Sequence, residues 1–174
     1  EMHPLDVSPT LTAAASAYLV TGPRLLMAKG TLSEMAAQLT PHCPESARLL
    51  IPDMLELAEV YSAVSGHRNL RVRLEKITTD SCRKFHVDCV DLRLLRAYVG
   101  PGVQWTADEG QTVQEAPTGA VVFLNGKHFP ACVETERILH RSPPYSCRHV
   151  PWPVRLLLAC DEAHACGVCA SVLF

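Results

Sequence analysis

The hydrophobic periodicity of the chain changes near residue 69, and this change limits the folds that the chain can adopt. Residues 69–77 alternate apolar and polar side chains with a period of two, which is typical of a β-strand. The Asn125-Gly126 pair has the sequence of a two-residue hairpin turn. Further strand candidates, several of them followed by turn-forming residues, lie at residues 84–90, 92–99, 120–124, 138–141 and 153–160. Many short strands joined by turns favour a sandwich or barrel, and a double-stranded β-helix (jelly roll) over residues 69–160 fits best.

The first 68 residues have a helical pattern instead. Residues 8–20 carry apolar side chains at helical spacing and end before Gly22-Pro23, a pair that stops a helix. Residues 31–34 have the form of a capping box at the start of a second helix. A third apolar segment spans residues 44–66, and Pro52 is expected to split or kink it. We therefore expect an α+β protein in which helices of residues 1–68 pack outside the sheet and residues 161–174 form a cysteine-rich tail.

Composition excludes several classes of partner. The 174 residues are 48% hydrophobic and 20% charged, which are the values of a globular domain with a core of its own. A formal net charge of −2 gives no electrostatic reason to expect nucleic acid or an anionic membrane as a partner. No apolar stretch is long enough to cross a bilayer, and no export signal is visible. We expect a cytoplasmic protein whose eight cysteines are reduced thiols.

A His-x-Asp pair is the first candidate for chemistry. On an extended segment His86 and Asp88 project from the same face, because side chains alternate faces with a period of two. A second imidazole, His140, lies on a later strand candidate. Two histidines and one carboxylate form the ligand set of non-haem Fe(II) oxygenases, which keeps coordination positions open. We therefore predict that His86, Asp88 and His140 bind a metal ion and form the catalytic centre.

Two further residues suit a co-substrate that carries a carboxylate. Arg155 lies within an apolar strand candidate, where a buried cation usually meets an anion. A guanidinium can hold the far carboxylate of a 2-oxo acid through two parallel hydrogen bonds. Tyr98 could also contact the same ligand through its hydroxyl group. A half-buried tyrosine of the sheet is an equally good interpretation.

The order of these motifs resembles the prolyl-4-hydroxylase-like branch of the Fe(II)/2-oxoglutarate-dependent oxygenases. More closely, residues 82–88, 92–95, 98–105 and 140–144 resemble an uncharacterised bacterial family of unknown function. The resemblance implies a double-stranded β-helix, Fe(II), 2-oxoglutarate and oxygen, with a substrate that is either a protein side chain or a small molecule. The chain departs from the pattern in two respects. The spacing from His140 to Arg155 is longer, and Arg141 is a second candidate for the anchor of the co-substrate.

The cysteines near the C-terminus allow a different interpretation. Cys166 and Cys169 have the spacing of a zinc knuckle, and Cys160 could be a further ligand. Other candidate zinc ligands are Cys147, His149 and His164. The alternative function is therefore a cupin-like zinc-binding or sensor protein without catalysis, because one β fold can serve both purposes.

Overall fold

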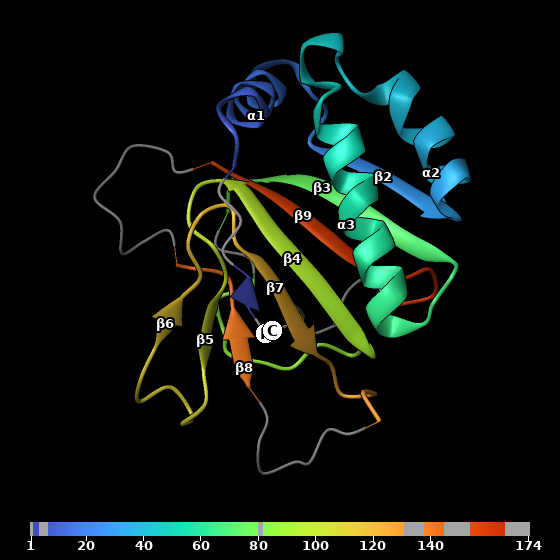
Figure 1. Cartoon of the computed structure of the whole chain (residues 1–174). Coiled ribbons are helices and arrows are strands. Elements are labelled where there is room, and N and C mark those ends of the chain that lie inside the picture. Colours follow the sequence, from blue (N-terminus) through green and yellow to red (C-terminus); the bar gives the residue numbers. More distant parts are fainter. Residues whose placement is uncertain (1, 4–6, 80–81, 131–137, 145–153, 166–174) are drawn as a thin grey trace.

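A computed structural model describes residues 2–3, 7–79, 82–130, 138–144 and 154–165 of the chain. The described residues form two antiparallel β-sheets, with the N-terminal helices against one face of the larger sheet (Figure 1). The mixed helical and β content agrees with the α+β class expected from the sequence. No described helix has the length and apolar character that crossing a bilayer requires.

The helices begin and end near the predicted signals. Helix α1 (Pro9–Thr21) starts after Ser8, whose hydroxyl accepts from the Leu11 amide, and α2 (Leu32–Leu39) starts with the predicted capping box. Helix α3 (Leu50–Ser65) ends at Gly66, which has the left-handed conformation that glycine tolerates best. Pro52 lies in the first turn of α3, where a missing amide hydrogen costs nothing. The chain before it forms two short 3₁₀ helices, Thr40–His42 and Glu45–Ala47.

The larger sheet has six strands in the order β1-β7-β4-β9-β3-β2. Their bounds are Met2–His3 (β1), Leu25–Gly30 (β2), Leu70–Ile77 (β3), Leu92–Val99 (β4), Val121–Asn125 (β7) and Arg155–Glu162 (β9). The prediction that the first 68 residues contain only helices was wrong for Leu25–Gly30. This segment has residues with good helix propensity, but pairing along the whole of β3 outweighs that preference.

The smaller sheet has three strands in the order β6-β5-β8. Their bounds are Gln104–Thr106 (β5), Gln114–Glu115 (β6) and Leu139–Arg141 (β8). Residues 84–90 were predicted to be a strand, but they make a single bridge, between His86 and His140. Asn125-Gly126 does not form the predicted hairpin. The Gly126 amide instead donates to the Asp91 carbonyl, and its Cα lies so close to the Val90 carbonyl that no side chain would fit.

Strand β9 lies at the centre of the larger sheet and separates two environments. On one face, Leu156, Leu158 and Cys160 are fully buried in the core shared with the helices. On the other face, Arg155 and Asp161 are also buried, although both carry charges. The neighbouring strands follow the same division, because Ile77 is paired with Arg155 and Arg71 with Asp161. The buried charges of Arg71, Arg155 and Asp161 therefore lie on the face of the sheet that is turned away from the helices.

Helix α3 is tied to β4 by one buried ionic contact. The Asp53 carboxylate accepts two hydrogen bonds from Arg96, at 2.8 and 3.1 Å, and a third from the Tyr98 hydroxyl. The Arg96 side chain is only 4% exposed, so its charge has little access to water. The contact orients α3 on the sheet and provides the countercharge that a buried guanidinium requires.

We expect Asp53→Ala to lower the free energy of unfolding by about 3 kcal/mol, because the substitution leaves a buried guanidinium without its partner. Urea denaturation followed by circular dichroism measures this loss. Glu59→Ala, at an exposed acidic position of the same helix, is the control and should change stability by less than about 0.5 kcal/mol. Equal stabilities of the two variants would contradict a structural role for the Asp53 contact.

Candidate metal centre

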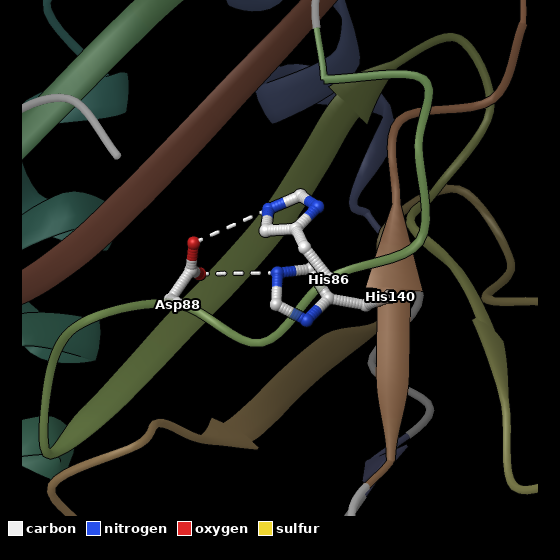
Figure 2. A group of neighbouring side chains, drawn as sticks. All are labelled: His86, Asp88 and His140. Carbon is white, nitrogen blue, oxygen red and sulfur yellow. Dashed lines mark hydrogen bonds and ion pairs between the residues drawn. The ribbon is translucent and has the colours of Figure 1, made fainter. Parts of the chain in front are cut away.

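Three side chains from two segments of the chain converge between the two sheets (Figure 2). His86 and Asp88 come from the loop before β4, and His140 comes from β8. The His86 amide donates to the His140 carbonyl and the His140 amide donates to the His86 carbonyl, both at 3.0 Å. This bridge fixes the two imidazoles next to each other, with ring centroids 4.6 Å apart. The loop keeps His86 and Asp88 on the same side, as the His-x-Asp spacing predicted, although it is not a strand.

The three donor atoms lie close enough to share one ion. One ligand atom from each of His86, Asp88 and His140 lies within 4.8 Å of the other two, and no other such group occurs among the described residues. The Asp88 Oδ2 atom is 3.0 Å from His140 Nε2, and Oδ1 is 3.4 Å from His86 Nε2. Asp88 and His140 are each 5% exposed. The geometry therefore brings the predicted ligands together in a site that excludes most water.

The tautomer of His86 indicates that a cation belongs between His86 and Asp88. The Nδ1 atom of His86 lies 2.8 Å from the Lys84 carbonyl, which can only accept, so Nδ1 carries a hydrogen. In a neutral imidazole, Nε2 then presents a lone pair toward the Asp88 carboxylate. Two electron-pair donors face each other stably only when a proton or a metal ion lies between them. The donor set therefore fits a divalent metal ion.

The electrostatics of the site keep Asp88 ionised. Burial alone would raise the pKa of Asp88, but hydrogen bonds from both histidines and the charge of Arg93 together lower it below its ordinary value. Arg93 NH1 lies 2.7 Å from Asp88 Oδ2. The hydrogen bond to Asp88 raises the pKa of His86, while burial opposes this shift. An ionised carboxylate is the form that a metal ion binds.

A cavity of about 150 Å³ opens beside the three ligands. Arg155 and Arg141, the two candidate anchors, both line it. Arg155 is 1% exposed, and it donates to the Pro101 carbonyl at 2.8 Å and to the Ser142 hydroxyl at 3.2 Å. Arg141 donates to Gln104 at 2.9 Å and lies over the Phe85 ring. The structure thus brings both arginines to the cavity that the ligands border.

Tyr98 lies elsewhere. Its hydroxyl donates to Asp53, so the ring belongs to the face of β4 that the helices cover. The prediction that Tyr98 could contact a co-substrate was therefore wrong, and the buried-tyrosine interpretation describes it. The strand contains a bulge between Ala97 and Val99, and sequence alternation alone did not indicate which face Tyr98 would take.

Sequence reasoning missed a group of charges next to the site. Arg73 and Arg93 line the cavity, and both contact Asp161, which is completely buried. A signal was present, because Arg71 and Arg73 alternate with apolar residues and must share one face of β3. Asp161 was assigned to the C-terminal tail, whereas β9 extends to Glu162.

The predicted zinc site cannot be assembled from the described residues. Cys166, Cys169, Cys147 and His149 lie outside them. Cys160 is buried in the core on the helical side of β9, and burial raises the pKa of its thiol. A thiol of raised pKa is a poor metal ligand, because the thiolate is the form that binds.

Solved structures resemble this fold at low sequence identity. A full-length Neurospora crassa protein in complex with alpha-KG is 14% identical with a TM-score of 0.52, and the match covers 91% of this chain and 71% of that one. Hydroxypropylphosphonic acid epoxidase from S. wedmorenis is 18% identical over 53% of this chain and 42% of its own, with a TM-score of 0.34. A bsmA homolog from Methylobium petroleophilum PM1 is 16% identical over 71% of this chain and 52% of its own, with a TM-score of 0.38. The chain therefore spans less than half the length of the epoxidase, and only the first likeness is close enough to show a shared fold.

Sequence comparison gives the family. No curated protein matches the chain. A family described as "Protein of unknown function (DUF1826)" matches residues 8–161, which is most of the chain and includes His86, Asp88 and His140. This agrees with the resemblance to a family of unknown function that the motifs indicated. The chain belongs to the DUF1826 family.

Proposed function

We propose that this protein is a non-haem Fe(II)- and 2-oxoglutarate-dependent oxygenase that hydroxylates a small molecule or a protein side chain. The observation that carries the proposal is the convergence of His86, Asp88 and His140 on one point beside a cavity that an arginine lines. Two histidines and one carboxylate leave positions on a metal ion for a chelating co-substrate and for oxygen. The cytoplasm, where Fe(II) and 2-oxoglutarate are both present, is the proposed location.

The path of the chain supports a double-stranded β-helix for this proposal. After β4 in the larger sheet, the chain forms β5 and β6 in the smaller sheet and returns for β7. It then forms β8 in the smaller sheet and β9 in the larger one. Such alternation between two facing antiparallel sheets is typical of a jelly roll. The similarity in fold to the Neurospora crassa protein, which was crystallised with alpha-KG, also supports it.

Fe(II) would be held by His86, Asp88 and His140, and, with 2-oxoglutarate as the co-reductant, it would activate O2, which is the oxidant for breaking a substrate C–H bond. The chain's own contribution is orientation and exclusion of water. The Lys84 carbonyl fixes the tautomer of His86, and Arg93 holds one oxygen of Asp88. The Nδ1 atom of His140 is buried without a hydrogen-bond partner among the described residues. Among the described residues, the backbone bridge to His86 positions this residue, and the contact of its Nε2 atom with Asp88 orients the ring.

Arg155 is the proposed anchor for the distal carboxylate of 2-oxoglutarate. It is fully buried at the cavity wall, so its charge is weakly screened by water and interacts strongly with an anion. The Pro101 carbonyl and the Ser142 hydroxyl fix the orientation of its guanidinium. The Arg141 guanidinium already donates to Gln104 and lies over the Phe85 ring. We therefore assign Arg141 to the opening of the cavity.

The first prediction concerns the metal centre. Anaerobic protein with Fe(II) and 2-oxoglutarate should show the weak visible charge-transfer band of the chelate, and His86→Ala should lose it because one of three ligands is gone. His42→Ala, at an exposed histidine of a 3₁₀ helix, should keep the band. Absence of the band in the wild-type protein would contradict the proposal. Elemental analysis of anaerobically purified protein that finds stoichiometric zinc, lost in Cys166→Ser or Cys169→Ser, would favour the zinc-binding alternative.

The second prediction separates the two candidate anchors. Arg155→Lys keeps a positive charge but loses the planar fork, so the Kd of 2-oxoglutarate for the Fe(II) protein should rise at least about tenfold. The intensity of the band, titrated with 2-oxoglutarate, measures this Kd. Arg141→Lys is the matched control and should change the Kd less than about threefold, because water at the cavity opening would screen its charge from the carboxylate. A larger effect of Arg141→Lys than of Arg155→Lys would indicate that Arg141 binds the distal carboxylate.

A further inference from the structure

A cluster of three arginines surrounds one buried carboxylate at the cavity wall. Arg71 Nε lies 2.8 Å from Asp161 Oδ1, while Arg73 NH2 and Arg93 NH2 lie 3.2 and 2.8 Å from Oδ2. Arg93 also contacts Asp88 of the metal centre at 2.7 Å. Three guanidinium groups thus share two carboxylates, one of which, Asp88, is also the proposed metal ligand. The cluster carries more positive than negative charge in a place that excludes most water.

The side chains that line the cavity also carry more positive than negative charge. The charged side chains that line it are Arg73, Arg93, Arg141, Arg155, Glu75 and Asp88. Fe(II) adds two positive charges and 2-oxoglutarate adds two negative charges, so loading both leaves the excess of positive charge unchanged. An unbalanced charge in a partly buried cavity is unfavourable unless an anion joins it. The proposed co-substrate therefore does not account for all of the arginines.

The Arg73 guanidinium has N–H groups without a hydrogen-bond partner among the described residues. Its guanidinium has five N–H groups, but among the described residues its hydrogen bonds go to Asp161 alone. The Nε atom is buried and has no partner there. Burial and the neighbouring charges of Arg93 and Arg71 lower the pKa of Arg73, while Asp161 opposes the shift. Glu75, two residues along β3, contacts Arg24 at 3.8 Å, and its charge also opposes the lowering of the pKa of Arg73.

Arg73 and Arg155 lie at different places along the cavity wall. Arg155 is paired with Ile77, and Arg73 precedes Ile77 by four residues on β3. Strands rise about 3.3 Å per residue, so Arg73 and Arg155 are offset by about 13 Å along the direction of the strands. A co-substrate anchored by Arg155 and chelating the metal ion would leave Arg73 available for a different ligand.

We propose that Arg73, supported by Arg93, binds an oxyanion group of the substrate, so that the substrate is a carboxylate or a phosphate compound. This inference rests on the proposed function, because it assigns the substrate of the same site. The guanidinium fork matches the paired oxygens of either group. Arg93 places the anion next to Asp88, so the oxyanion is bound close to the metal centre and positions the remainder of the substrate there.

The test measures anion binding to the metal-free full chain by isothermal titration calorimetry, with inorganic phosphate in one arm and acetate in the other. Arg73→Gln should weaken binding of the preferred anion at least about tenfold, since one charge-assisted hydrogen bond contributes about that factor. Arg24→Gln, at a side chain 78% exposed, is the control and should retain the wild-type affinity. Arg155→Gln is measured beside it, because it reports any anion that binds at the proposed co-substrate anchor instead of at Arg73. The arm with the larger Arg73-dependent effect identifies phosphate or carboxylate as the substrate group.

Several outcomes would overturn the inference. These are no measurable binding of either anion to the wild-type protein, equal affinities in wild type and Arg73→Gln, and a loss of binding in Arg155→Gln alone. The charge-transfer band of Fe(II) and 2-oxoglutarate is recorded for each variant and should persist in Arg73→Gln. A wild-type protein without that band but with Arg73-dependent anion binding would contradict the proposed function and leave the anion site in place. If Arg73→Gln does not fold, Arg73→Lys, which keeps the charge beside Asp161 but loses the fork, should weaken binding in its place.

Discussion

The alternation of side chains along β9 is the constraint on which the rest of the structure depends. This strand is paired along both edges, with β4 and β3, and residues on both of its faces are buried. One face, with Leu156, Leu158 and Cys160, provides the apolar surface that holds the helices. The opposite face must accommodate Arg155 and Asp161 away from bulk water. Buried charges are stable only with partners, and this requirement selects the residues that the second sheet and the facing strands present.

A chain of charge contacts links the candidate metal centre to the sheet. Asp88 is held by Arg93, Arg93 is held by Asp161, and Asp161 also receives Arg71 and Arg73. Asp161 is shared by three arginines and Arg93 by two carboxylates, so none of these charges can be removed without affecting its neighbours. The contacts therefore keep Asp88 ionised and oriented toward the two histidines, and they also leave positive charge at the cavity wall.

Much of the fold and the centre of the site followed from the amino-acid pattern. The helix starts at Ser8 and Thr31 and the stop at Gly66 are local hydrogen-bonding signals, which act wherever the segment lies in the molecule. The spacing of His86 and Asp88 also determines that they share a face of any extended segment. Leu25–Gly30 and the residues after Asn125 were different, because their conformation depends on which strand lies next to them.

The sequence by itself therefore determined the types of ligand, the pairing of His86 with Asp88, and a buried cation at Arg155. Only the tertiary structure decided that His140 meets that pair, that Tyr98 faces Asp53, and that Arg93 joins Asp88 to Asp161. The physical reason is the separation along the chain over which each kind of interaction acts. Periodicity and capping act over a few residues, whereas the partner of a buried charge is chosen by which distant strands the sheets bring together.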